Sequence, residues 1–397
     1  MAAAESRASE VPLAPSFPAG RQALRVLFCT HNYFPAAAGG AERQAQLQAE
    51  ALTARGHEVT VVCRRTGSFA TERINGVNVI RLRAVDLPFL RALTHMVALY
   101  AFVLRRGRRF DLVHVHLASV QAEVVVRAAR LLRRPVYVKV ACGGSVGDVR
   151  RHPFIGRVTR HLGLRRAARV QALSSEIEGE LISVGVDPRR ILRIPNGIRL
   201  RASTRDGNLQ RAARRDLALP ETGKVVLYAG RFATYKGVPE LLEAWRGADR
   251  PPATLVMVGT ADTHYAVDVP VGIPGVEVRG WSNDLSSYFA AADVFVHPAH
   301  ADGMPNALLE AMSFGLPVAA AETPATRPLV IDGQNGVMFR AGDARSLASG
   351  VARLVSDEEL MSGAEVVALQ TAKAYAIDDV IERIEQAYYA ILNEVDG

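Results

Sequence analysis

The chain has 397 residues, of which 49% are hydrophobic and 22% are charged, with a net charge of +8. This composition excludes a disordered or fibrous protein, and the length exceeds that of one ordinary domain, so we expect two. No apolar run reaches the roughly 18–20 residues that a membrane-spanning helix needs.

The start of the chain and its cysteines indicate the compartment. Residues 1–20 are rich in Ala, Pro and Ser and lack the apolar centre of a signal peptide, so we expect a disordered tail. Cys29, Cys63 and Cys142 have unrelated spacings, which predict neither a disulfide framework nor a metal site. We therefore expect a cytoplasmic protein.

The charge is distributed unevenly along the chain. Residues 1–205 hold 33 Lys and Arg against 14 Asp and Glu, a net +19, whereas residues 206–397 hold 15 against 26, a net −11. A basic first half indicates an anionic partner, which could be a membrane surface, a nucleic acid or a phosphorylated ligand. The alternative is a solvated basic face that binds only counterions.

The first half begins as a βαβ unit. A short apolar run at 24–30 predicts a buried strand, a helical pattern follows over 41–55, and a second strand is predicted at 58–64. This order implies a parallel sheet. Further strands of the same sheet are predicted at 77–82, 111–117, 135–141, 169–174 and 190–198.

An apolar helix with a basic end is predicted at 94–110. One interpretation is a core helix with a charged terminus. The other is peripheral attachment to the anionic inner face of the cell membrane through Arg105, Arg106, Arg108 and Arg109. Farther along, His114 and His116 share one face of a strand, but no carboxylate ligand accompanies them, so we expect no metal there.

The second half repeats the plan of the first. Residues 201–220 are polar and basic and predict a linker between a domain at 21–200 and a domain at 221–375. Residues 376–397 are helical and are expected to cross back to the first domain. In the second domain we predict strands at 225–231, 253–259, 276–281, 293–299 and 316–321 and helices at 237–248, 284–292 and 306–314.

Two doubly wound α/β domains in sequence predict a cleft lined by loops at the carboxyl ends of their strands. One such loop, at 300–306, carries Asp302 and Gly303, and Pro305 suits the first turn of the helix that follows. A helix N-terminus attracts phosphate, and Glu310 one turn onward suits a sugar diol, because a carboxylate accepts two hydrogen bonds. The alternative is that Asp302 caps the helix and Glu310 is solvated.

A second loop of the same half carries two cations. Arg231 and Lys236 follow the strand at 225–231 in "AGRFATYKG". Two cations beside a helix N-terminus could clamp a diphosphate. Two basic residues on a loop are otherwise solvated.

Together these residues resemble the retaining glycosyltransferases of family 4, which have the GT-B fold. "DGMPNALLEAMSFGLPV" is similar to the family's signature of two glutamates separated by seven residues, with Asp302 in place of the first. "AGRFATYKG" resembles its diphosphate-binding segment, and "FPAAAGGAERQ" resembles its N-terminal glycine loop. The resemblance covers about residues 24–390 and implies an α/β protein with two Rossmann-like domains facing a central cleft.

The resemblance also implies roles for individual residues. Arg231 and Lys236 would contact the diphosphate of a nucleoside diphosphate sugar, Asp302 the sugar and Glu310 the ribose. No Asp-x-Asp motif is present, so neither a metal nor another cofactor is expected. The remaining donor contacts would be Gly303, Met304, Pro305, Asn306, Gly39, Gly40 and Gly259, and the acceptor-side residues Lys139, Cys142 and Gly143.

Three positions depart from the family pattern. Asp302 is one methylene shorter than glutamate, Cys142 stands where relatives often carry a histidine, and Pro328 stands where many carry a glutamate. We interpret Cys142 as a buried thiol that lines the cleft and not as a catalytic group.

Three functions follow as hypotheses. The first is a metal-independent retaining glycosyltransferase that acts on a glycan or lipid-linked acceptor in polysaccharide or cell-envelope synthesis. The second is a nucleotide-sugar epimerase of the same architecture. The third is a non-enzymatic nucleotide- or nucleic-acid-binding protein that uses the basic half, although the sequence has no recognisable nucleic-acid motif.

Overall fold

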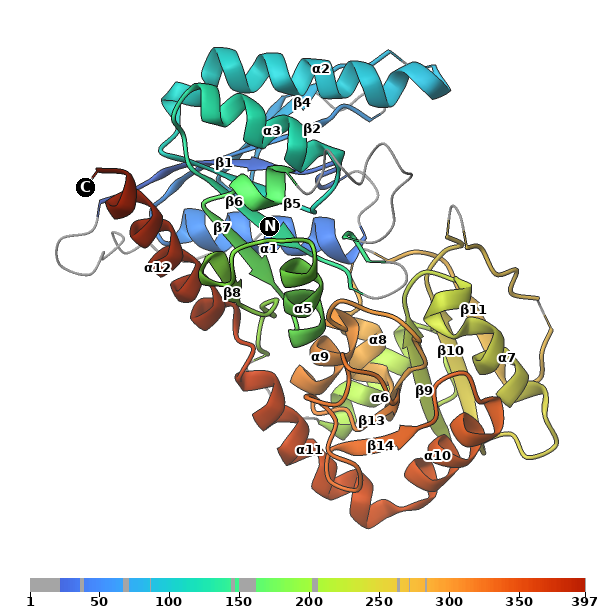
Figure 1. Cartoon of the computed structure of the whole chain (residues 1–397). Coiled ribbons are helices and arrows are strands. Elements are labelled where there is room, and N and C mark those ends of the chain that lie inside the picture. The colour runs from blue at the N-terminus through green and yellow to red at the C-terminus, as the bar shows by residue number, and fades with distance from the viewer. Residues whose placement is uncertain are drawn as a thin grey trace, which may run out of the picture.

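The computed structural model describes residues 22–35, 39–66, 71–85, 87–143, 147–149, 162–201, 206–262, 265–270, 272–282 and 284–396. They form two α/β domains, one built on an eight-stranded sheet and one on a six-stranded sheet. The domains lie end to end, and the last helix runs beside the first domain (Figure 1).

The first sheet has the order β3-β4-β2-β1-β5-β6-β7-β8 and is parallel except for the edge strand β3. Strands β5 and β6 are buried at every residue, as expected for central strands that are covered on both faces. The strands are β1 (Arg25–Cys29), β2 (Glu58–Arg64), β3 (Glu72–Ile74), β4 (Val77–Leu82), β5 (Leu112–His116), β6 (Val136–Val140), β7 (Arg169–Ala172) and β8 (Ile191–Arg193).

Helices cover both faces of this sheet. One face packs against α1 (Gly40–Ala54) and α12 (Ile377–Asp396), and the other against α2 (Pro88–Arg106), α3 (Val120–Leu131) and α5 (Ser175–Ser183). The predicted helix at 94–110 therefore begins earlier, at Pro88, and ends at Arg106, where the 3-10 turn η1 (Gly107–Arg109) follows. A second such turn, η3 (Pro188–Arg190), precedes β8.

The second sheet has the order β11-β10-β9-β12-β13-β14 and is parallel throughout. Successive strands are added outward in opposite directions from β9 and from β12. A crevice therefore opens between these two strands at their carboxyl ends. The strands are β9 (Lys224–Ala229), β10 (Ala253–Val258), β11 (Val276–Arg279), β12 (Val294–His297), β13 (Val318–Ala321) and β14 (Gly336–Phe339).

The helices of the second domain also form two layers. One face of the sheet packs against α7 (Val238–Arg246) and α10 (Ala344–Ser356). The other packs against α8 (Ser286–Ala291), α9 (Asn306–Ser313) and α11 (Glu358–Lys373). The expected doubly wound α/β architecture is thus present in both halves.

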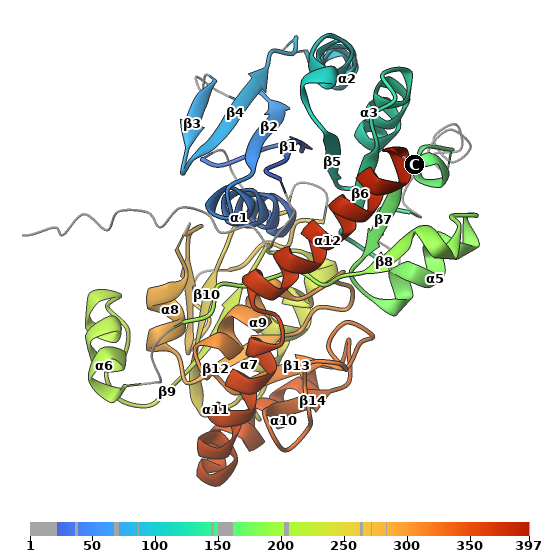
Figure 2. The ribbon, with the colours of Figure 1, turned by 90° about the vertical axis from the view of Figure 1, so that its left-hand side faces the viewer.

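The chain crosses between the domains twice, and the two crossings touch. Ile198 and Ala376 form a parallel β-bridge, and the Ile377 N–H donates to the Ile198 carbonyl at 2.9 Å. Helix α12 then lies along the first domain (Figure 2), where Glu385 accepts a hydrogen bond from Arg55 at 2.7 Å. The end of the chain is thereby part of the first domain's core.

The predicted linker at 201–220 differs in the structure. Helix α6 (Gly207–Asp216) begins there after Asp206, whose carboxylate accepts a hydrogen bond from the Asn208 N–H. It packs on α8 through Arg214, which is buried and lies 2.5 Å from the Asp293 carboxylate. The prediction was wrong over α6 because a buried arginine replaces the apolar residues by which a helix face is recognised.

Candidate functional site

The predicted cations lie at the crevice of the second sheet. Arg231 follows β9, and its Nη1 is 3.0 Å from Asp262 Oδ2. Lys236 ends the turn η4 (Thr234–Lys236), and its Nζ is 2.6 Å from Asp302 Oδ2, beyond the end of β12. The structure therefore brings Arg231, Lys236 and Asp302 to one place and adds Asp262, which the sequence analysis missed.

Glycines allow the loops of the crevice to approach one another. Gly237 has φ +70, and a Cβ there would lie 2.0 Å from the Pro298 carbonyl oxygen. At Gly259, where φ is +159, a Cβ would lie 1.8 Å from the carbonyl oxygen of Gly230. Any side chain at either position would push the Lys236 loop or the Arg231 loop away from its neighbour.

Asp302 does not cap the helix that follows it. The N-cap of α9 is Pro305, which offers no side-chain hydrogen bond, whereas the Asp302 carboxylate is held by Lys236. It also lies 3.6 Å from His297 Nε2. Burial lowers the pKa of His297 to about 4, so the ring is neutral near neutral pH. His297 ends β12, and its place near the end of the strand predicted at 293–299 was the only sign in the sequence that it lies beside the site.

Glu310 faces the cleft, as the helical spacing predicts. Leu308, Leu309 and Met312 of α9 are fully buried against the sheet. The Glu310 side chain is 18% exposed and lies 3.5 Å from the Nε of Arg43, which belongs to α1 in the other domain. Burial raises the pKa of Glu310, and Arg43 opposes that rise. Arg43 was not among the site residues predicted from the sequence.

The loop before α9 touches the first domain. A Cβ at Gly303 would lie 1.8 Å from the Ala141 carbonyl oxygen, directly beyond β6. Asn196 bridges to the same loop, because its Nδ2 donates to Asn306 Oδ1 at 2.9 Å and its N–H approaches Met304 Sδ at 3.1 Å. Carboxyl-terminal loops of both sheets therefore meet at Gly303, Met304 and Asn306.

The contact at Gly303 gives a testable prediction. Gly303→Ala should lower the activity of the site more than tenfold, because the new Cβ meets backbone that cannot move without separating the domains. Small-angle X-ray scattering should show a larger radius of gyration. Gly179→Ala, where a Cβ meets nothing within 4 Å, is the matched control. An active, equally compact Gly303→Ala protein would contradict the prediction.

The glycine loop at the start of α1 also reaches the site. A Cβ at Gly40 would lie 3.4 Å from Asn306 Nδ2 of the other domain. The N–H of Gly39 donates to Glu42 Oε2 at 3.0 Å, which is the glutamate half of a capping box, because glycine has no side chain to complete it. Gly40 therefore lies beside Asn306 at the cleft, with Gly39 directly before it, and residues 36–38 of this loop lie outside the described part of the chain.

Two of the three acceptor-side residues lie at the same junction. The Asp148 carboxylate accepts hydrogen bonds from the N–H groups of Ala141 and Cys142, at 2.8 and 3.1 Å. Burial raises the pKa of Cys142 to about 12, so its thiol is protonated and is no nucleophile at neutral pH. Gly143 packs against Ile177, which a Cβ would approach to 2.9 Å.

Lys139 is not at the cleft surface. It is 2% exposed on the central strand β6, in register with His116 on one side and Gln171 on the other. Its Nζ has no hydrogen-bond partner among the described residues, and burial lowers its pKa to about 7. The expected acceptor contact is therefore not made, because helices cover both faces of this strand.

The basic residues predicted to meet a membrane lie away from the cleft. Arg105 and Arg106 end α2, and Arg108 and Arg109 are in η1, and all four are exposed. Within the described ranges, we find no helix with the length and apolarity required to cross a bilayer. The described residues also contain no cluster of three or more His, Cys, Asp or Glu that could hold a metal ion.

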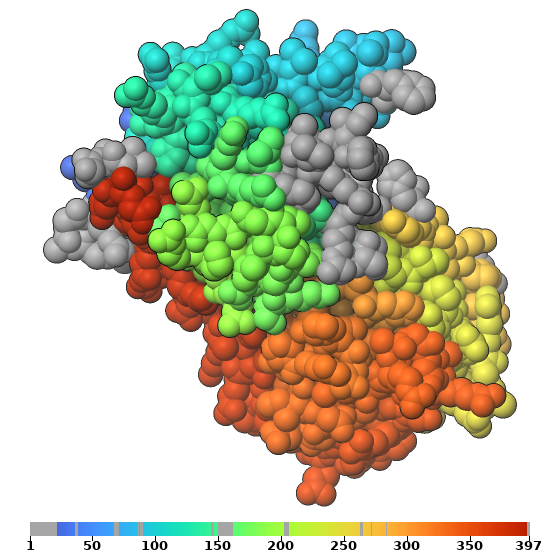
Figure 3. All heavy atoms as spheres, in the orientation of Figure 1, coloured from blue at the N-terminus to red at the C-terminus, as the bar shows by residue number. Residues whose placement is uncertain are grey.

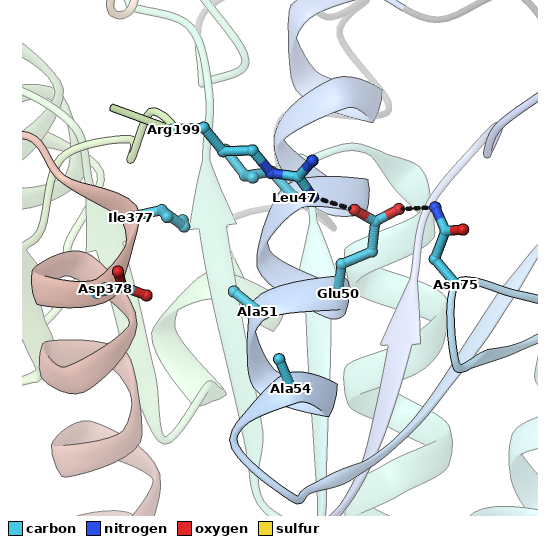
Figure 4. Close-up of a pocket in the computed structure, with 8 residues that line it drawn as sticks. All are labelled: Leu47, Glu50, Ala51, Ala54, Asn75, Arg199, Ile377 and Asp378. Carbon is cyan, nitrogen blue, oxygen red and sulfur yellow. Dashed lines mark hydrogen bonds and ion pairs between the residues drawn. The ribbon is translucent and has the colours of Figure 1, made fainter. Parts of the chain in front are cut away.

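A separate pocket of about 540 Å³ lies between α1 and the start of α12 (Figure 4). Its wall includes Glu50, which accepts hydrogen bonds from Arg199 at 2.5 Å and from Asn75 at 2.7 Å. Ile377 and Asp378 of α12 line the opposite side. Because Arg199 and Ile377 belong to the two interdomain crossings, this pocket lies beside those crossings and not at the predicted donor site.

The chemistry of the cleft follows from its ion pairs. Arg43, Arg231 and Lys236 are each paired with a carboxylate, and the pairs surround the loop before α9. An anionic ligand that enters the cleft can replace the carboxylate that is bound to a cation. A polyol can replace the cation that is bound to a carboxylate. The arrangement suits a ligand with both a diphosphate and sugar hydroxyls.

Comparison with known proteins agrees with this geometry. Residues 223–357 match the family described as "Glycosyl transferases group 1", and residues 39–197 match the "Glycosyl transferase 4-like domain". The chain is 23% identical over 364 residues to UDP-Gal:alpha-D-GlcNAc-diphosphoundecaprenol alpha-1,3-galactosyltransferase of Escherichia coli. This match covers 88% of this chain and 93% of that protein. It is 31% identical over 161 residues to the lipopolysaccharide core biosynthesis glycosyltransferase LpsE of Rhizobium meliloti, over 40% of this chain and 47% of that protein.

Solved structures show the same fold. HepE of Anabaena in complex with UDP-glucose has a TM-score of 0.77 at 21% identity, over 92% of this chain and all of that one. Sucrose-phosphate synthase of Thermosynechococcus elongatus has a TM-score of 0.76 at 22% identity, over 94% and 100%. The expected GT-B fold is confirmed. Because a glycosyltransferase family model matches each of the two domains, the chain belongs to the glycosyltransferase group 1 family.

Proposed function

We propose that this protein is a retaining glycosyltransferase that moves a sugar from a nucleoside diphosphate sugar to a glycan or lipid-linked acceptor in polysaccharide or cell-envelope synthesis. The observation that carries the proposal is the pair of cations, Arg231 and Lys236, at the crevice between β9 and β12, next to the Asp302 and Glu310 carboxylates. The printed names of the relatives support the same class, since they include a galactosyltransferase with a diphosphoundecaprenol-linked acceptor and a capsular polysaccharide enzyme.

In this proposal the cations stabilise the leaving group. Arg231 and Lys236 bind the diphosphate and balance the negative charge that grows on it as the bond to the anomeric carbon breaks. This role requires no metal ion. The diphosphate competes with Asp262 and Asp302 for the two cations, which frees the Asp302 carboxylate to accept hydrogen bonds from the donor sugar.

The acceptor completes the reaction on the same face of the sugar. Its hydroxyl oxygen forms the new bond to the anomeric carbon, and its proton passes to an oxygen of the departing diphosphate, so the configuration is retained. Two neighbours of the site are poorly suited to take that proton. His297 has a pKa near 4, and the Cys142 thiol stays protonated because its pKa is about 12.

Glu310 holds the nucleoside in this scheme. Its carboxylate binds the two ribose hydroxyls beside Arg43, which reaches it from the other domain at 3.5 Å. The basic first domain receives the acceptor. We further infer that the enzyme works on the cytoplasmic side of the membrane, where nucleotide sugars would meet a lipid-linked acceptor.

A panel of nucleotide sugars tests the proposal. UDP-, GDP- and ADP-linked sugars are added to the full chain, and thermal unfolding is followed. A ligand at about a hundredfold excess over its Kd stabilises the fold by about 2.7 kcal/mol. We expect one class to raise the melting temperature and Lys236→Ala to reduce that rise. No stabilisation by any member would contradict the proposal, and release of an epimerised sugar without acceptor would indicate an epimerase instead.

A further inference from the structure

Helix α2 has an apolar outer face. Leu90, Leu93 and Val97, which we call the outer row, are 43%, 60% and 61% exposed and follow one another at helical spacing. The opposite side of the same helix is also apolar, because Leu99 and Val103 are fully buried against the first domain. A helix on a solvated surface is normally polar on its outer side, so this face indicates a partner.

The exposed apolar residues are concentrated around this row. Of the 14 exposed large apolar side chains in the described part of the chain, five lie between residues 85 and 97. Val85 and Leu87 add to the outer row directly before the helix begins. Such clustering distinguishes the region from the scattered exposed leucines that any protein surface carries.

Arginines flank the outer row. Residues 83–134 contain ten Arg and three acidic residues. Of the acidic residues, Asp111 is paired with Arg25, Glu123 is buried and lies 3.8 Å from Arg127, and Asp86 lies outside the described part of the chain. The exposed arginines of α2, η1 and the adjacent α3 are Arg91, Arg105, Arg106, Arg108, Arg109, Arg127 and Arg130.

The position of α2 leaves this face accessible. The helix lies along the end of the first domain that is farthest from the second domain (Figure 1). Its side chains form a long stretch of the surface at that end (Figure 3). The side chains of the outer row are exposed, and the described elements that pack on α2 lie on its other side.

We propose that the outer face of α2 docks on an anionic lipid bilayer. Leu90, Leu93 and Val97 enter the boundary between headgroups and acyl chains, and the flanking arginines bind lipid phosphates. Charge complementarity selects this partner over a second copy of the chain, because residues 83–134 hold ten Arg against three acidic residues and two copies would bring two such positively charged segments together. In this contact the apolar outer row enters the membrane and the arginines lie around it, whereas the sequence alone indicated a membrane contact through the arginines.

This inference does not depend on the donor chemistry. It deepens the proposed function, because a lipid-linked acceptor lies in the surface on which the first domain would rest. Vesicle binding can be measured without any nucleotide sugar, so failure of the transferase proposal would leave it standing. Conversely, a transferase that ignores vesicles would overturn this inference alone.

Co-sedimentation of the full chain with vesicles provides the test. One set contains equal parts phosphatidylcholine and phosphatidylglycerol, and the other contains phosphatidylcholine only. We expect binding to the anionic set, weaker binding at high salt, and at least about tenfold weaker binding by the double variant Leu93→Gln and Val97→Gln. The matched control is Leu209→Gln with Val366→Gln, which changes two equally exposed apolar residues of the second domain.

A second arm examines the arginines. Arg105→Gln, Arg106→Gln and Arg109→Gln together should weaken binding to the anionic set severalfold. Arg211→Gln, Arg215→Gln and Arg246→Gln, which remove the same charge from exposed positions of the second domain, should not. Circular dichroism verifies that each variant is folded, and the single variant Leu93→Gln replaces the double one if the latter is unstable.

Three results would overturn the proposal. The first is unchanged vesicle binding by the Leu93→Gln and Val97→Gln variant. The second is equal binding to both sets of vesicles. The third is a dimer, seen by analytical ultracentrifugation without lipid and lost in that variant, which would assign the face to a second copy.

Discussion

Replacing Lys236 by alanine is expected to lower the turnover number about a hundredfold to a thousandfold. Removing one preorganised donor from a site where charge develops costs that much in other enzymes. Lys236 is suited to this role because its side chain is only 18% exposed, so its charge is weakly screened. The measurement is the initial rate of sugar transfer with saturating donor.

The control for Lys236 must separate charge from fold. Lys236→Ala leaves the half-buried Asp302 without its cation, so the free energy of unfolding should be measured beside the rate. Lys373→Ala removes an exposed cation from α11 and should change neither quantity. A Lys236→Ala enzyme with normal turnover would refute the role in stabilising the diphosphate, whatever its stability.

Replacing Glu310 by glutamine is expected to weaken nucleotide binding about tenfold to a hundredfold. A hydrogen bond to a charged group contributes about 1.5–3 kcal/mol, and an amide offers only one acceptor oxygen in place of two. The side chain keeps its size and its position on α9, so the fold should persist. Isothermal titration with the nucleoside diphosphate measures the effect, and Glu358→Gln on the exposed start of α11 is the control.

The pH dependence of binding gives Glu310 an independent readout. Burial raises the pKa of this carboxyl, so its protonated fraction grows at a higher pH than for an exposed glutamate. Since the ionised form binds the ribose, affinity should be full above the raised pKa and should fall as the pH drops through it. Glu310→Gln should lack this component of the pH profile. Identical profiles for the two proteins would contradict the ribose assignment.

Local sequence information was sufficient for most of the fold. Strands such as β1 and β9 are apolar along nearly their whole length because they are buried on both faces, and this pattern needs no knowledge of their neighbours. The loop before α9 was predicted for a similar reason, since Pro305 and the buried Leu308 and Leu309 fix the start and the inner face of the helix. Glu310 then had to lie on the other side.

The ion pairs of the site could not be predicted in this way. Arg43 and Glu310 are far apart in the sequence and meet only because the two domains close on one another. Asp262 and His297 each come near their partners through the packing of separate strand ends. Pairing across elements depends on distances in space, and a single sequence carries no record of them.

Burial was the other property that only the tertiary structure decided. Lys139 ends in the interior because both faces of β6 are covered, and Arg214 is buried because α6 lies on α8. Conversely, α2 is apolar on both sides, and its periodicity does not say which side remains exposed. The sequence by itself determined most of the strands and helices and the candidate motifs of the site, because these depend on local spacing. Only the packed structure decided which polar groups are paired, which are buried and which apolar face is left uncovered.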